Sequence, residues 1–188
     1  TGAGLADDMQ KGIMSRFRAL PMSRAAVLVG RTASDVVYNV LSLLIMALTG
    51  LLVGWRIHTS GFEAAFGFAL LLAFAYAFSW VMAYIGLLVP SVEVINNASF
   101  IVIFPLTFIA NTFVPSESLP TALRAFAEWN PVSAVTQAAR DLFGNIPPGT
   151  PEPSAWPMQN AALYTVIWIV AIIAVFAPLS VARFRRPR

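Results

Sequence analysis

Four long apolar stretches, separated by polar breaks, dominate the pattern of hydrophobic and polar positions along this sequence. A run of about 20 apolar residues is long enough to cross the roughly 30 Å hydrocarbon core of a bilayer as a helix. Polar breaks are expected at residues 56–61 and 90–97. The third stretch is short, and Pro105 removes a backbone hydrogen bond, so this helix is expected to kink or partly break. The predicted spans are residues 36–55, 64–89, 98–113 and 161–182.

A short charged helix is predicted before the first span, over residues 5–21. Its apolar residues recur at spacings of four, four, four and three, which places them on one stripe of a helix. Five charges make it a poor span, and Pro21 ends it. We therefore expect the apolar stripe to lie against a surface, either the bilayer interface or a groove in a soluble partner. It consists of Leu5, Met9, Ile13, Phe17 and Leu20.

A proline-rich loop is predicted between the third and fourth spans, over residues 114–158. Within it, residues 119–129 and 132–143 form two short amphipathic helices hinged at Asn130 and Pro131. They are either a re-entrant hairpin that caps the outer mouth of a pathway, or an interfacial pair packed on the spans. The expected apolar faces are Leu123, Phe126, Ala127 and Trp129, then Val135, Ala138, Ala139 and Leu142, with Arg124, Glu128, Arg140 and Asp141 pointing to water.

The composition supports a membrane protein. Of 188 residues, 58% are hydrophobic and 11% are charged, whereas an ordinary soluble domain has about 25% charged residues. The sequence contains no cysteine, which excludes disulfides and thiolate metal sites. The net charge is +3, but the basic residues cluster at the ends of segments instead of covering a soluble face, so nucleic acid is not an expected partner.

The distribution of Lys and Arg predicts the orientation. With residues 5–21 in the cytoplasm, four spans return the C-terminus to the cytoplasm, and nine basic residues lie inside against three outside. The sequence thus predicts a multi-pass plasma-membrane protein whose proline-rich loop faces outward. The inner set is Lys11, Arg16, Arg18, Arg24, Arg31, Arg183, Arg185, Arg186 and Arg188, and the outer set is Arg56, Arg124 and Arg140.

No phosphate-binding GxxxxGK[ST] motif occurs in the sequence, so this chain cannot hold ATP in that way. The predicted spans have no ionisable residue at their centres, where a proton-coupled carrier would need one. A nucleotide-driven permease is therefore favoured over a gradient-driven one. His58 is the only histidine, which leaves a metal site or a histidine-based triad without support.

Several polar and aromatic residues in the predicted spans are candidates for a substrate path. A mixed aromatic and polar wall suits an amphiphilic substrate. Helix packing, lipid contact and hydrogen bonding at a helix end are competing explanations for the same residues. The candidates are Tyr38, Asn39, Ser42, Tyr76, Trp80, Tyr84 and, near the outer end of the third span, Asn111.

Three motifs point to a known family: GLADDMQKGIMSRFRALPMSR at residues 4–24, Phe113-Val114-Pro115, and Trp129-Asn130-Pro131 followed by an alanine-rich helix. Together with the order of parts, they make the sequence similar to the ABC-2 type permeases, most closely the daunorubicin-resistance-like drug or lipid exporters. The resemblance covers essentially the whole chain. These permeases usually have two further spans at the N-terminus, so we expect this sequence to be part of a longer one.

The resemblance implies an all-α membrane protein, a polytopic transmembrane bundle of the type V exporter kind with a cytoplasmic coupling helix and external re-entrant helices. It implies that residues 5–21 dock in a separate ABC ATPase subunit, which binds ATP and magnesium, and that this chain holds no cofactor. It also implies a second permease copy, in a homodimer or pseudo-dimer, and outward movement of a hydrophobic drug-like or lipid substrate. The implied coupling residues are Asp7, Asp8, Met9, Lys11, Gly12, Ile13, Arg16, Phe17 and Arg18.

Two other functions are compatible with a polytopic helical chain. A non-catalytic membrane scaffold or assembly subunit would need no coupling to an ATPase. An intramembrane enzyme acting on lipids would need convergent Ser, His and Asp side chains or metal ligands at the membrane face, which this sequence lacks.

Overall fold

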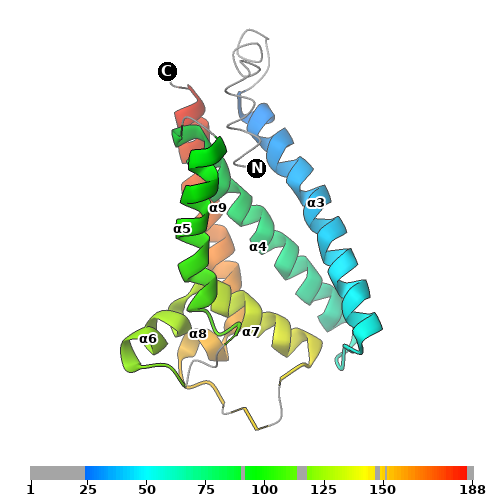
Figure 1. The fold of residues 1–188 in the computed structure, drawn as a ribbon. Helices are drawn as coiled ribbons and strands as arrows, with labels where there is room; N and C mark the ends of the chain where they lie inside the picture. The colour runs from blue at the N-terminus through cyan, green and yellow to red at the C-terminus, as the bar shows by residue number, and fades with distance from the viewer. Residues whose placement is uncertain (1–23, 90–91, 114–117, 147–148, 151, 186–188) are drawn as a thin grey trace. The chain divides into compact units, whose positions relative to one another are not determined.

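The computed structural model describes residues 24–89, 92–113, 118–146, 149–150 and 152–185. Every regular element in these ranges is a helix (Figure 1). The predicted charged helix over residues 5–21 lies outside the described residues. The helices are α3 (Arg24–Val53), α4 (Gly61–Leu88), α5 (Val92–Phe108), α6 (Thr121–Trp129), α7 (Pro131–Phe143), α8 (Trp156–Gln159) and α9 (Ala161–Arg185).

Three of these helices are long and apolar enough to cross a membrane: α3 over Thr32–Val53, α4 over Gly61–Leu88 and α9 over Ala161–Phe184. The helix α5 is apolar but shorter. Hydrogen bonding within each helix satisfies most of its backbone, as a bilayer core requires, but Pro105 in α5 and Pro178 in α9 have no N–H to donate.

The third apolar helix begins earlier than the predicted span of residues 98–113, because α5 starts at Val92. The expected break at residues 90–97 is therefore helical from Val92 onwards. Glu93 suits the positive end of the helix dipole in the first turn, and Asn96 and Asn97 are exposed, so none of the three interrupts the helix. The helix also continues through Pro105, and the Ile109 N–H donates to the Pro105 carbonyl, so the expected partial break is absent.

The chain divides into two compact units. Unit 1 contains the described residues of 1–41, 75–102 and 170–188, and unit 2 contains those of 42–74 and 103–169. Each of α3, α4, α5 and α9 contributes residues to both units. The short helices α6, α7 and α8 belong wholly to unit 2 and contact one another (Figure 1).

The core of unit 1 joins α4 to α9. Trp80, Ala83 and Leu87 lie on one face of α4 and pack with Phe184 of α9. The Ser180 hydroxyl of α9 donates to the Trp80 carbonyl across 3.4 Å. In a bilayer, lipid tails are as apolar as the side chains, so close packing and such hydrogen bonds hold two helices together more than removal from water does.

The core of unit 2 is organised around α7. Ala138 and Leu142 of α7 pack between Leu70 of α4 and the start of α9. The ring of Phe143 lies edge-on to Trp55 at 5.4 Å and tilted against Phe68 at 4.9 Å. Gly67 of α4 faces this ring so closely that a Cβ there would lie 2.9 Å from Phe143 Cε1.

The turn that follows α3 donates hydrogen bonds to the C-terminal end of α7. The last carbonyls of a helix lack partners within it. Here Leu142 accepts from the Thr59 hydroxyl at 2.5 Å, and Phe143 accepts from the His58 N–H at 3.0 Å. Gly144 ends the helix with φ of 68°, a left-handed conformation that favours glycine.

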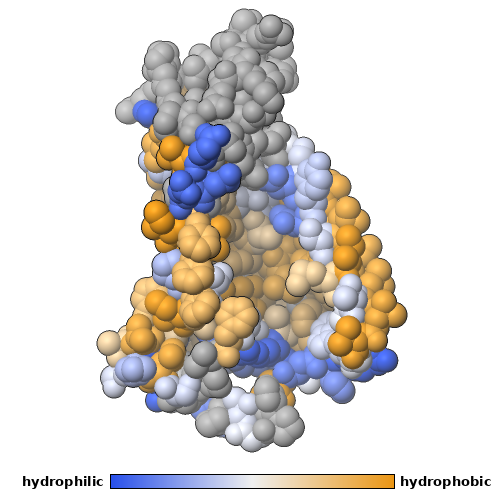
Figure 2. Space-filling model, viewed as in Figure 1, coloured by the Kyte–Doolittle hydropathy of each residue, from blue (hydrophilic) through white to orange (hydrophobic). Residues whose placement is uncertain are grey.

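The apolar surface of α3 is uncovered within the described residues. None of the 18-residue apolar window in α3 is buried. The space-filling view shows this apolar surface on the right (Figure 2). A surface of this kind faces lipid or another protein segment in a membrane. Its most exposed large side chains are Val37, Tyr38, Met46, Leu52 and Val53.

Candidate functional site

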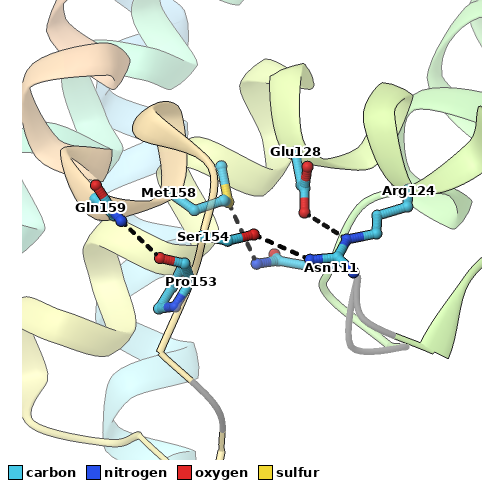
Figure 3. Close-up of polar contacts among 7 residues, drawn as sticks. All are labelled: Asn111, Arg124, Glu128, Pro153, Ser154, Met158 and Gln159. Carbon is cyan, nitrogen blue, oxygen red and sulfur yellow. Dashed lines mark hydrogen bonds and ion pairs between the residues drawn. The ribbon is translucent and has the colours of Figure 1, made fainter. Parts of the chain in front are cut away.

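The densest group of buried polar contacts in unit 2 lies where the chain after α5 meets α7 and α8. Asn111 is 7% exposed, and its backbone N–H donates to the Ser133 hydroxyl at 3.0 Å. Its Nδ2 donates to Gln137 Oε1 at 3.4 Å. The same Nδ2 approaches Met158 Sδ at 3.7 Å, as Figure 3 shows. Its Oδ1 has no hydrogen-bond partner among the described residues. This candidate substrate-path residue therefore joins three segments and keeps one acceptor atom free.

Arg140 also belongs to this junction, which makes the expectation that it points to water wrong. Its Nη2 donates to the carbonyls of Asn111 and Thr112 at 3.0 and 3.2 Å. Carbonyls beyond the end of a helix need donors from elsewhere, and a guanidinium supplies several in a fixed fork. Sequence reasoning missed this role because the amphipathic pattern of α7 shows which face is polar but not what that face meets.

Asp141 follows Arg140 and accepts a hydrogen bond from Gln137 Nε2 at 2.9 Å. Partial burial raises the pKa of the Asp141 carboxyl above its ordinary value, against the opposing effects of the Gln137 hydrogen bond and the positive charge of Arg140. The carboxyl thus binds a proton more readily than that of a fully solvated aspartate.

The predicted hinge between the two short helices is held by Asn130. Its Oδ1 accepts from the Val132 N–H at 2.9 Å, so Asn130 is the N-cap of α7, and Pro131 occupies the first helical position. Its Nδ2 donates to the carbonyl of Leu106 in the last turn of α5 at 2.7 Å. A single buried amide therefore starts α7 and ties it to the end of α5.

Replacement of Asn130 by alanine is expected to destabilise unit 2. Loss of the N-cap costs about 0.5–2 kcal/mol, and the Leu106 carbonyl loses its partner, which adds about 1–3 kcal/mol. We expect thermal unfolding in detergent to begin several degrees lower. Asn145→Ala is the matched control, because the Asn145 side chain hydrogen-bonds only the nearby Phe143 carbonyl among the described residues. Equal melting temperatures for the two variants would contradict this role of Asn130.

The polar side of α6 is tied to the segment before α8. Arg124 forms an ion pair with Glu128 at 2.8 Å and donates to the Ser154 hydroxyl at 3.0 Å (Figure 3). Glu128 is only 13% exposed, so these two side chains do not simply point to water as expected. Gln159 of α8 in turn donates to the Pro153 carbonyl at 2.9 Å.

An aromatic cluster joins α6, α8 and α9 around Tyr164. The rings of Trp129, Trp156 and Trp168 lie edge-on to the Tyr164 ring at 6.0, 6.0 and 6.2 Å. The Tyr164 hydroxyl donates to the Trp129 carbonyl at 3.1 Å. The short helix α8 is not among the helices predicted from the sequence, although Trp156-Pro157 places a proline in its first turn, which is a helix-start signal.

The other substrate-path candidates are distributed over both units. In unit 1, Tyr76 and Trp80 are in edge-on ring contact at 6.4 Å. Trp80 is buried, and its Nε1 has no hydrogen-bond partner among the described residues. The Tyr84 ring contacts Phe176 of α9 at 5.8 Å. On α3, Tyr38 and Ser42 are exposed, and Asn39 is half-buried.

All nine candidate coupling residues fall within residues 5–21, outside the described residues. Their role in docking an ATPase therefore stays a prediction. The helix α3, which follows this segment, is described from Arg24 onwards and is continuous to Val53.

The family model for the ABC-2 type transporter matches residues 1–143. This chain belongs to the ABC-2 type transporter family. It is also 32% identical over 191 residues to the daunorubicin resistance ABC transporter permease protein DrrB1 of Streptomyces coeruleorubidus. That alignment covers 98% of this chain and 62% of the relative, so the chain spans less than two thirds of the relative's length. No solved structure matches the chain significantly.

Membership of the ABC-2 family confirms the resemblance read from the motifs and the all-α membrane fold. Together with the three helices able to span a bilayer, it identifies a multi-pass membrane protein. The family is one of transporter permeases, which carry a substrate and generally do not catalyse a reaction themselves.

Proposed function

We propose that this chain is part of the membrane subunit of an ABC exporter that moves a hydrophobic drug-like or lipid substrate out of the cell. The observation that carries the proposal is the match to the ABC-2 family together with 32% identity to a permease named for daunorubicin resistance. The largely uncharged interiors of α4 and α9 agree with a path for an apolar substrate.

A separate ATPase subunit supplies the energy in this proposal, and it binds the ATP and magnesium. Residues 5–21 are the docking element, because Met9, Ile13 and Phe17 provide an apolar stripe for a groove and the charged residues around them provide a rim. The excess of Lys and Arg near this segment and near the C-terminus supports a cytoplasmic location for both.

The outward loop contains α6, α7 and α8, and we place it over the outer end of the substrate path. Support comes from Asn111, a candidate path residue that contacts α7 and whose Oδ1 has no hydrogen-bond partner in the described part of the chain. A second permease copy, identical or homologous, completes the transporter. The uncovered apolar surface of α3 is available to such a copy as well as to lipid.

The decisive experiment reconstitutes the full-length permease in vesicles with its partner ABC ATPase. We expect daunorubicin, used as the probe, to stimulate ATP hydrolysis and to accumulate in inside-out vesicles only when ATP is hydrolysed. An ATPase variant that binds but does not hydrolyse ATP is the control. Normal assembly with the ATPase but no stimulation by daunorubicin or by a panel of membrane lipids would favour the scaffold alternative.

A further inference from the structure

The apolar face of α6 is not covered by any other described part of the chain. Five residues of this helix are exposed and apolar, and they occupy an arc of about 160° at 100° per residue. Ala127 is the one buried residue of α6, so most of the apolar face predicted for this helix is exposed. The space-filling view shows apolar atoms around α6 at the lower left (Figure 2). The exposed residues are Ala122, Leu123, Ala125, Phe126 and Trp129.

We propose that this face of α6, together with Trp156 of α8, is a membrane-interface anchor that lies at the boundary between the lipid headgroups and the acyl chains. Leu123, Phe126, Trp129 and Trp156 are 43%, 48%, 57% and 48% exposed. The anchor does not depend on the direction of transport or on the ATPase, because it follows from the position of α8 at one end of a span.

The depth of Trp156 follows from the short connection between α8 and α9. The two helices are separated only by Asn160, and α9 can cross a bilayer from Ala161. Five residues of mostly helical chain rise by at most about 10 Å, and the headgroup layer on each side of the hydrocarbon core is roughly 5–8 Å thick. Trp156 is therefore held close to the headgroup layer.

The helix α6 is held at the same depth by contacts within unit 2. Trp129 and Trp156 flank Tyr164, which lies in the first turn of α9, and the Tyr164 hydroxyl donates to the Trp129 carbonyl. On the other side of α6, Arg124 reaches Ser154 of the segment that leads into α8. These contacts fix α6 beside the end of a span.

The chemistry of the face fits lipid better than water or a charged partner. Tryptophan favours the interface because its ring is apolar while its indole N–H can reach polar groups. The charges of α6 are paired with each other and lie on the opposite side of the helix. With nine residues, α6 is about 14 Å long, too short to cross the hydrocarbon core, so it lies in the interface instead of spanning it.

Site-directed spin labelling tests the anchor. The sequence has no cysteine, so Phe126→Cys places one nitroxide on the apolar arc, and Thr121→Cys places the control on the exposed polar side of the same helix. In the full-length permease in phosphatidylcholine vesicles, we expect the label at position 126 to collide with oxygen several-fold more than with a water-soluble nickel chelate. The control label should show the reverse preference. Leu123→Cys replaces Phe126→Cys if the latter does not fold.

Two outcomes would overturn the anchor. Equal access of the nickel chelate to positions 121 and 126 would mean that the face is in water. An immobilised label at position 126 that neither oxygen nor nickel reaches would mean that a protein surface, such as a second copy, covers it. Neither outcome bears on daunorubicin-stimulated ATP hydrolysis, so failure of the anchor and failure of the exporter proposal are distinguishable.

Discussion

Replacement of Gly67 by leucine is expected to prevent unit 2 from packing correctly. A single added Cβ would already lie 2.9 Å from Phe143 Cε1 and 3.3 Å from Leu142 Cβ. The Phe143 ring has little room to move, because Trp55 and Phe68 contact it. Overpacking costs about 1–3 kcal/mol or more, which lowers the melting temperature by roughly 5–10 °C in a chain of this size. Fluorescence-detected size-exclusion chromatography after heating measures the change.

Two further variants make the test specific. Gly30→Leu is the matched control, because Gly30 also lies in an apolar helix but has nothing within 4 Å of an added Cβ. Phe143→Ala introduced into Gly67→Leu makes space for the new side chain and should restore part of the lost stability. If Gly30→Leu were as harmful as Gly67→Leu, or if the double variant were no better than Gly67→Leu, the close approach of α4 to Phe143 would not be the cause.

Replacement of Phe17 by aspartate is expected to uncouple the permease from its ATPase. Phe17 lies on the apolar stripe of residues 5–21 that we propose as the docking element. Loss of a central aromatic anchor costs about 2 kcal/mol or more at an interface, equivalent to roughly a 30-fold weaker interaction. We expect substrate-stimulated ATP hydrolysis in proteoliposomes to fall at least tenfold, while membrane insertion and the yield of folded permease stay unchanged.

The control for this effect carries the same charge on the other side of the helix. Ser15→Asp changes a residue on the polar side and should leave ATP hydrolysis close to that of the original protein. An equal loss in both variants would indicate a general effect of negative charge near the membrane. Unchanged activity in Phe17→Asp would show that the stripe rests on lipid instead of docking in the ATPase.

The helical elements of unit 2 follow closely from the sequence. The amphipathic pattern predicts helices at residues 119–129 and 132–143, and the structure has α6 at Thr121–Trp129 and α7 at Pro131–Phe143. The hinge at Asn130 is predictable because an asparagine before a proline is both a strong N-cap and a poor place to continue a helix. Residues close together in the sequence determine these helices and this hinge, so the sequence alone predicts them.

The partners of the polar side chains do not follow from the sequence. Arg140 has the position of a solvated residue on an amphipathic helix, yet it donates to carbonyls beyond the end of α5. The early start of α5 was missed because Glu93, Asn96 and Asn97 resemble a polar break, although none of them interrupts the helix. The short helix α8 was missed although Trp156-Pro157 is a local helix-start signal.

The sequence by itself determined that this chain is a helical membrane protein of the ABC-2 type, because hydrophobic length, charge distribution and family motifs are all properties of short stretches. Only the tertiary structure decided which side chains of α7 and α8 contact the chain after α5. It also decided that the Phe143 ring packs against Gly67, where a larger residue would clash, and that the apolar face of α6 is exposed. The physical reason is that amphipathic periodicity shows which side of a helix is apolar, whereas the residues that cover that side are distant in the chain.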